Sequence, residues 1–178
     1  MSPMIEPKRQ VVVGIADCRV TADTAASIVT YALGSCIAVT IHDPVARVGG
    51  MLHLMLPESS LDPAKAEKNP YMFADTGIPL LFRTACGQGA DKKRMVVRVA
   101  GGAQVMDEAG VFNIGKRNCL AVKKVLWQAG VMVRAESVGG RESRTVRLEM
   151  ESGRFFMRTA GGAEQDLDGR NYGGNLNR

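Results

Sequence analysis

The apolar residues of this chain gather in short runs bounded by polar residues, a pattern typical of β-strands. Such runs predict strands at residues 10–16, 27–33, 36–42, 48–56, 95–100, 131–138, 144–151 and 154–159. Asp43-Pro44-Val45-Ala46 predicts a turn between the third and fourth strands, because proline presets the φ angle of a type I turn. Ser152-Gly153 predicts a hairpin between the last two strands.

Two segments instead place apolar residues three or four positions apart, as on one face of a helix. The first stripe consists of Ile78, Leu81, Phe82, Ala85 and Cys86, and the second of Cys119, Val122, Leu126 and Ala129. Asp75-Thr76 and Asn113 can cap the starts of these helices, and glycines follow both stripes. Residues 58–70 are polar, contain two prolines and predict a loop.

The order of these elements decides the fold class. Strands follow one another in runs rather than alternating with helices, which favours an α+β layered fold with a mainly antiparallel sheet over a doubly wound one. A chain of 178 residues has room for one domain, which we expect at residues 10–160. We expect residues 1–9 and 161–178 to be flexible termini, since glycine, asparagine and charge dominate after Gly161.

Composition excludes two classes of protein. Apolar residues make up 46% of the chain and charged residues 23%, so a disordered solvating protein is excluded. The longest unbroken apolar run, residues 11–16, is far shorter than the roughly 18 residues of a membrane span. Residues 1–9 have no apolar core of a secretory signal. We therefore expect a cytoplasmic protein without direct membrane insertion.

The charge of the chain and its possible ligand motifs narrow the classes of function further. A net charge of +5 permits acidic partners, but the spread of the basic residues and 5% aromatic content do not predict nucleic-acid binding. Four cysteines without a Cys-x-x-Cys pair, and only two histidines, predict neither a metal nor a cofactor. Residues 110–116 match G-x-x-x-x-G-K, but Arg117 stands where a phosphate loop needs serine or threonine.

Cys36 and His53 form the most informative pair. If residue 42 pairs with residue 47 across the predicted turn, Cys36 lies directly opposite His53 on the neighbouring strand. Opposed Cβ atoms are about 4.5–5.5 Å apart, so a thiol and an imidazole would be in contact. We expect His53 to lower the pKa of the Cys36 thiol and activate it as a nucleophile.

The residues before Cys36 add two further roles. Gly34-Ser35 predicts a turn, whose N–H groups at Ser35 and Cys36 can face a developing oxyanion. If the chain reverses at Leu33-Gly34, Thr30 returns close to the pair, where its oxygen can orient His53. The alternative is simple packing, since free cysteine is among the most buried residue types.

The chain also resembles a known family. The resemblance rests on Gly34-Ser35-Cys36, His53-Leu54-Met55-Leu56-Pro57, Ala74-Asp75-Thr76, Ala100-Gly101-Gly102-Ala103 and Asn113-Ile114-Gly115-Lys116-Arg117-Asn118. In that order these motifs are similar to those of CheD, the chemoreceptor glutamine deamidases, from about Val11 to Thr159.

That resemblance implies stacked, mainly antiparallel β-sheets with flanking helices, similar to the catalytic domain of cytotoxic necrotizing factor toxins. It implies a Cys36–His53–Thr30 triad that hydrolyses receptor glutamines to glutamate and releases ammonia. It further implies binding to a CheC-type phosphatase, with Met106 as the contact. An aromatic residue stands at that place in some relatives.

Two other classes of function remain open at this stage. The first is a binding module that regulates a phosphatase while Cys36 stays idle. The second is a basic nucleic-acid binder, which only the net charge of +5 favours. Ammonia release that depends on Cys36 would separate the enzyme from both.

Overall fold

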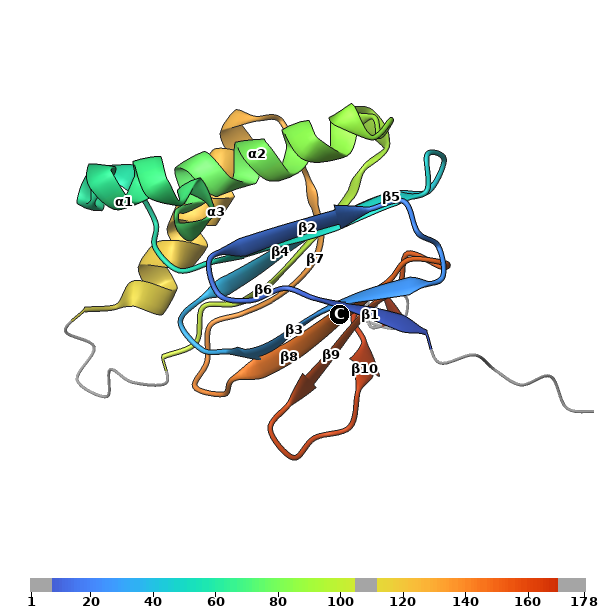
Figure 1. The fold of residues 1–178 in the computed structure, drawn as a ribbon. Coiled ribbons are helices and arrows are strands. Elements are labelled where there is room, and N and C mark those ends of the chain that lie inside the picture. Colours follow the sequence, from blue (N-terminus) through green and yellow to red (C-terminus); the bar gives the residue numbers. More distant parts are fainter. Residues whose placement is uncertain (1–7, 105–111, 170–178) are drawn as a thin grey trace, which may run out of the picture.

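The computed structural model describes residues 8–104 and 112–169, and it has three layers. Figure 1 shows the helices on one face of a twisted sheet, and a second sheet against the opposite face. We call the sheet in the middle the inner sheet and the other the outer sheet. None of the helices in the described part of the chain is long and apolar enough to span a membrane.

The inner sheet places the longest apolar strands at its centre. Its strand order is β2 (Asp17–Thr21), β5 (Val48–Leu54), β4 (Ile37–Asp43), β6 (Val96–Gly101) and β7 (Val133–Val138). Neighbours are antiparallel except β6 and β7, which are parallel because helix α3 connects them as a crossover. Every residue of β4 and β5 is buried, because both faces of this sheet are covered.

The outer sheet contains both the first and the last of the described strands. Its strand order is β1 (Arg9–Val12), β3 (Ala26–Leu33), β8 (Arg144–Glu149), β9 (Phe155–Thr159) and β10 (Gln165–Asp166). Only β1 and β3 are parallel. The predicted class, a layered and mainly antiparallel α+β fold, is confirmed.

Three α-helices cover the inner sheet. They are α1 (Pro63–Lys68), α2 (Ala74–Gly87) and α3 (Ile114–Gln128), and short 3-10 turns lie at Ser59–Leu61, Pro70–Met72 and Lys92–Arg94. One core lies between these helices and the sheet, with Ile37 and Leu52 packed near Leu81 and Leu126. A second core lies between the two sheets, where Ala38 and Met51 face residues such as Ile28, Val146 and Phe155.

Two strands were not predicted. Strand β2 carries Asp17, Arg19 and Thr21 at alternating positions, so it has no apolar run, and it pairs at an edge of the inner sheet. Strand β10 belongs to the segment after Gly161, which we expected to be flexible. That expectation is wrong as far as residue 169, since Leu167 is buried and Asp168 binds Arg98 through oxygen–nitrogen distances of 2.6 and 2.8 Å.

The β4–β5 turn is built around Asp43, whose side chain is fully buried. Its carboxylate accepts hydrogen bonds from the N–H groups of Val45, Ala46 and Asp91 and from the Arg94 guanidinium. Burial alone would raise the pKa of Asp43, but Arg94 and the N–H donors outweigh it and hold that pKa below its usual range.

His42 is buried beside this turn, although its place next to a predicted turn would suggest a surface position. Its Nε2 atom lies 3.3 Å from the carbonyl oxygen of Met150 in the segment that follows β8. A position near the turn therefore did not mean exposure, because the outer sheet covers this face of β4.

We predict that Asp43→Asn lowers the free energy of unfolding by about 1–3 kcal/mol, measured by urea denaturation at pH 7. Asparagine keeps an acceptor for the turn, but it leaves Arg94 without its buried counter-charge. The folded-state pKa of Asp43 lies below the unfolded-state value, so the stabilisation exists above about pH 4 and disappears as the pH falls further.

Asp91→Asn is the matched control. The carboxylate of Asp91 lies 3.3 Å from the same guanidinium, but its side chain is half exposed. We expect this variant to change the free energy of unfolding by less than about 0.5 kcal/mol. Equal losses in the two variants would contradict the role given to Asp43.

Candidate functional site

The site begins where the chain crosses from the outer sheet to the inner sheet. Gly34-Ser35-Cys36 connects the end of β3 to the start of β4, and its three carbonyl oxygens accept hydrogen bonds in succession. Ala103 N–H donates to Gly34, the Asn118 side chain to Ser35 and Gly102 N–H to Cys36, each at 2.8 Å. In a trans peptide the N–H points opposite to the C=O, so the N–H groups of Ser35 and Cys36 point away from these donors.

Glycine is required where β6 passes this crossing. Gly101 has a φ of +114°, and a Cβ atom there would lie 2.2 Å from the carbonyl oxygen of Cys36. A Cβ atom at Gly115 would similarly lie 2.5 Å from the carbonyl oxygen of Gly102. These two glycines let β6 and α3 approach the Cys36 crossing closely enough to hold it.

His53 lies near the end of β5, between Ala38 on β4 and Asp17 on β2, and is 2% exposed. Its Nδ1 atom is 2.8 Å from the hydroxyl oxygen of Thr30 on β3, so this contact joins the two sheets. The expected meeting of Thr30 with His53 is therefore observed. It results from the stacking of two sheets and not from a hairpin at Leu33-Gly34.

The hydrogen bonds of Thr30 define the protonation of the imidazole. The Thr30 hydroxyl has one hydrogen, which it donates to the carbonyl oxygen of Val13 at 2.7 Å. It can therefore only accept at His53, so Nδ1 carries the proton and Nε2 has a free electron pair. Nε2 is buried, and no described group forms a hydrogen bond with it.

The predicted register of β4 and β5 was wrong by two residues. The pairs are Asp43 with Val48 and Ala38 with His53, so Cys36 is diagonal to His53 rather than opposite it. The cause is a longer turn, in which Arg47 adopts a left-handed φ of +57° that the sequence did not indicate. A shift of two residues preserves the face of the sheet, so the diagonal relation keeps Cys36 and His53 on one side.

The expected electrostatic activation is also not found. Burial lowers the pKa of His53 to about 4 and raises the pKa of the Cys36 thiol, which its own N–H only partly offsets. At neutral pH the free protein therefore holds a neutral thiol and a neutral imidazole. The lowered thiol pKa that we expected for Cys36 is contradicted.

Two side chains that sequence reasoning missed hold the site together. The fully buried Asn118 of α3 donates both amide hydrogens, one to the carbonyl oxygen of Ser35 and one to that of Met55, each at 2.8 Å. It thereby fixes the residue before Cys36 to the chain that follows His53. Asp75, expected as a helix cap, instead accepts hydrogen bonds from the N–H and hydroxyl of Ser59 and fixes the loop after β5.

The remaining site predictions have mixed outcomes. Ser35 lies in the crossing as expected, but Met106 lies outside the described residues, as do Gly110 and Val111 of the near-match to a phosphate loop. Across residues 8–104 and 112–169, no three side chains of the metal-binding types gather into a possible ligand set.

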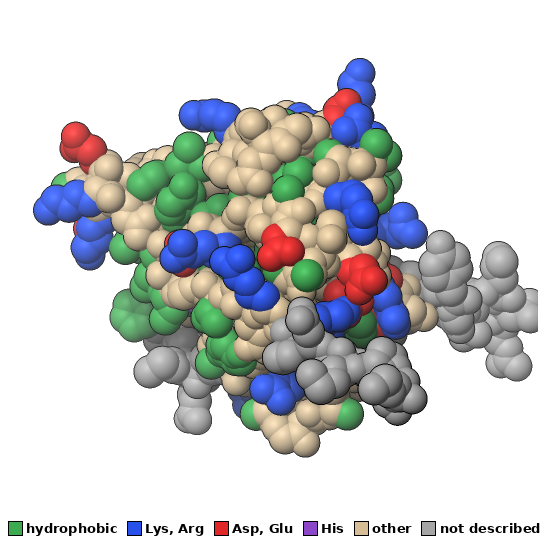
Figure 2. All heavy atoms as spheres, turned by 45° about the vertical axis from the view of Figure 1, so that its right-hand side comes forward, with side chains coloured by type: hydrophobic (Ala, Val, Ile, Leu, Met, Phe, Trp, Pro, Cys, Tyr) green, Lys and Arg blue, Asp and Glu red, His purple; other side chains and the backbone are tan. Residues whose placement is uncertain are grey.

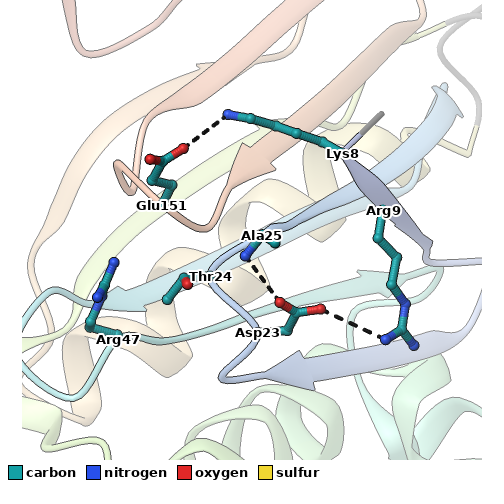
Figure 3. Close-up of a pocket in the computed structure, with 7 residues that line it drawn as sticks. All are labelled: Lys8, Arg9, Asp23, Thr24, Ala25, Arg47 and Glu151. Atoms are coloured by element: carbon teal, nitrogen blue, oxygen red, sulfur yellow. Dashed lines mark hydrogen bonds and ion pairs between the residues drawn. The ribbon is translucent and has the colours of Figure 1, made fainter. Parts of the chain in front are cut away.

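A second hollow lies at the opposite end of β2 and β5 and offers no comparable chemistry. Figure 3 shows its lining, in which Lys8 pairs with Glu151 and Arg9 with Asp23 at nitrogen–oxygen distances of 3.4 and 3.7 Å. On the face drawn in Figure 2, acidic side chains likewise lie among basic ones. Both carboxylates of this hollow are thus paired, and Arg47 is its one further charged side chain. The site at Cys36 and His53 remains the stronger candidate.

Comparison with known proteins identifies the family of this chain. The family model "CheD chemotactic sensory transduction" matches residues 55–159. A probable chemoreceptor glutamine deamidase CheD of Solibacter usitatus is 55% identical over 85% of this chain and 90% of its own. A second such protein, from Syntrophus aciditrophicus, is 50% identical over 88% and 98%.

A third relative carries the name without the qualifier. The chemoreceptor glutamine deamidase CheD of Thermotoga maritima is 44% identical over 78% of this chain and 85% of its own. The family model covers more than half of the chain, and these relatives are similar over most of its length, so the chain belongs to the CheD family.

Proposed function

We propose that this protein hydrolyses glutamine side chains of chemoreceptors to glutamate and releases ammonia. Cys36 is the nucleophile, His53 the general base and acid, and Thr30 the group that orients His53. The observation that carries the proposal is the free electron pair on His53 Nε2, fixed by the hydrogen bond from Nδ1–H to Thr30. The names of the relatives supply the substrate class.

The first half of the reaction forms a thioester. As the sulfur of Cys36 attacks the carboxamide carbon, His53 Nε2 takes the thiol proton, and then gives it to the departing amide nitrogen. Ammonia leaves, and the acyl group stays on sulfur. Because both groups start neutral, the thiol is deprotonated during the attack and no stored thiolate is needed.

The second half returns the enzyme to its starting state. Water attacks the thioester carbon while His53 Nε2 takes one of its protons, and collapse of the intermediate expels the Cys36 sulfur. The sulfur recovers its proton from His53, and glutamate remains on the receptor. In both halves the N–H groups of Ser35 and Cys36 can stabilise the oxyanion, since their partner carbonyls are held on the other side.

A CheC-type phosphatase as partner stays a prediction of the family resemblance, since Met106 lies outside the described residues. A regulatory module with an idle Cys36 is the competing function. A regulatory module has no use for the buried hydrogen bond between Thr30 and His53, whereas the proposed reaction depends on it.

Replacing the nucleophile tests the function directly. We predict that Cys36→Ala abolishes ammonia release from a receptor cytoplasmic fragment while the melting temperature changes little, since Cys36 is only half buried. The readouts are ammonia and the mass change from glutamine to glutamate. Cys86→Ala is the matched control, because Cys86 is an exposed thiol at the end of α2, and it should keep full activity. Equal ammonia release by the wild type and Cys36→Ala would show that the nucleophile is another group. No ammonia release by the folded wild type would support the regulatory module instead.

Thr30 is tested by removing its hydroxyl alone. We predict that Thr30→Val lowers turnover about 10- to 1,000-fold, equivalent to about 1.4–4 kcal/mol, because Nδ1–H loses its acceptor and the imidazole its orientation. The variant also leaves the Val13 carbonyl unpaired, which should cost about 1–3 kcal/mol of stability. Thr30→Ser retains the hydroxyl and should recover most of the turnover. A Thr30→Val protein that is folded and fully active would place the orienting group elsewhere.

The pH profile tests the neutral pair. Activity requires neutral His53, whose pKa is lowered to about 4, so kcat/KM should stay nearly constant from about pH 8 down to about pH 5 and fall only as the pH approaches 4. An ordinary histidine would instead lose activity below about pH 6.5. Circular dichroism at each pH separates loss of activity from unfolding. An acid limb at or above about pH 6.5 would contradict the neutral pair.

A further inference from the structure

The outward side of α3 has an unusual composition. Its exposed residues include Lys116, Arg117, Leu120, Lys123, Lys124 and Trp127, which we call the α3 face. Lys116, Leu120, Lys123 and Trp127 follow one another at spacings of four, three and four residues, so they form one stripe. The helix contains no acidic residue between Ile114 and Gln128.

Two large apolar side chains lie in this cationic stripe. Leu120 is 59% exposed, and Trp127, the only tryptophan of the chain, is 79% exposed. Leaving an indole in water sacrifices a large hydrophobic contribution, and tryptophan is enriched at protein interfaces. A stripe that combines such side chains with cations on a helix that has no acidic residue fits a binding surface better than a solvated helix face.

The cations of the α3 face are not committed to strong partners. Lys123 lies 3.2 Å from Glu136 and Lys124 lies 3.9 Å from Glu58, and all four side chains are well exposed. Exposed pairs of this kind contribute about 0–1 kcal/mol each, so an incoming carboxylate can compete for the lysines. Within the described residues, Lys116 and Arg117 form no ion pair.

The helix that carries the α3 face also supports the candidate site. Asn118, in the first turns of α3, holds Ser35 and Met55 beside Cys36 and His53. Lys124 reaches Glu58, only five residues after His53 in sequence. In Figure 1 the start of α3 lies at the end of the molecule where β5 ends and β4 begins. From Asn118 to Trp127 the helix extends about 14 Å, enough to contact several turns of a second helix.

We propose that the α3 face docks an acidic, amphipathic helical segment of the receptor while a glutamine of that receptor occupies the site. Its carboxylates meet Lys116 and Lys123, and its apolar side chains cover Leu120 and Trp127. The inference rests on the proposed function for the identity of the partner, and it adds where that partner binds and which charge it carries. Electrostatic complementarity of this kind selects acidic partners and speeds association at low salt.

Trp127 provides its own reporter, since no other tryptophan contributes to the fluorescence of the chain. We would titrate the Cys36→Ala protein, which leaves glutamine unmodified, with a tryptophan-free receptor fragment from which the wild type releases ammonia. Binding should shift the Trp127 emission to shorter wavelength and reduce its quenching by acrylamide. The affinity should decrease as salt increases.

Charge reversal identifies the surface. Lys116→Glu combined with Lys123→Glu should weaken fragment binding about tenfold or more, measured by calorimetry and by the Trp127 signal. Arg83→Glu combined with Arg158→Glu makes the same change in net charge at exposed positions on α2 and β9, and it should alter the affinity less than twofold. Melting temperatures confirm that each variant is folded.

Each other outcome would overturn the inference. If calorimetry detects binding but Trp127 does not respond, or if both double variants lose affinity equally, the receptor docks elsewhere. A Trp127 response to anionic lipid vesicles or to a CheC-type phosphatase, without one to the receptor fragment, would assign the α3 face to a different partner. If the wild type releases no ammonia from any receptor fragment, the proposed function fails first, and the two failures are thus distinguishable.

Discussion

A chain of two buried hydrogen bonds joins the sheets and determines what the site can do. The Val13 carbonyl accepts from Thr30, and Thr30 accepts from His53 Nδ1–H. The Val13 carbonyl can only accept, so the single hydrogen of the Thr30 hydroxyl is donated to it. The hydroxyl must then accept the second hydrogen bond, which fixes the direction of both. The outer sheet therefore supplies the acceptors, while the inner sheet supplies the imidazole, whose Nε2 atom keeps a free electron pair.

The stacking of the two sheets does not by itself hold Cys36, so several other elements contribute hydrogen bonds around it. Sheet stacking positions His53 but not the crossing that carries the thiol. Three donors, from Gly102, Ala103 and Asn118, hold the crossing by its carbonyl groups, and the missing side chain of Gly101 permits the contact. Cys36 is thus placed by backbone geometry, and its thiol and the N–H groups of Ser35 and Cys36 take no part in the hydrogen bonds that hold the crossing.

The sequence was informative where a pattern maps directly onto burial. The apolar runs located β4 and β5 because both faces of the inner sheet are covered, and the expected proximity of Thr30 to His53 is observed. The alternating polar residues concealed β2, and the register was wrong because the left-handed Arg47 lengthens the turn. Asn118 resembled an ordinary helix residue, since its role depends on two carbonyl groups brought there by the fold. The direction of the Cys36 pKa could not be predicted, because it depends on how deeply the stacked sheets bury the pair.

The contact between Asp168 and Arg98 has a consequence for how the protein is made. Arg98 lies on β6 within the inner sheet, whereas Asp168 follows β10 seventy residues later, and β3 must likewise wait for β8 to find its partner. A chain emerging from the ribosome can pair β4 with β5 early. However, β3 has no antiparallel neighbour until β8 is synthesised, and the guanidinium of Arg98 does not meet its carboxylate partner until Asp168 is synthesised. Contacts of such long sequence separation slow folding. The hydrogen bond between Thr30 and His53 therefore forms late in folding, because β3 gains its antiparallel neighbour only after β8 has been synthesised.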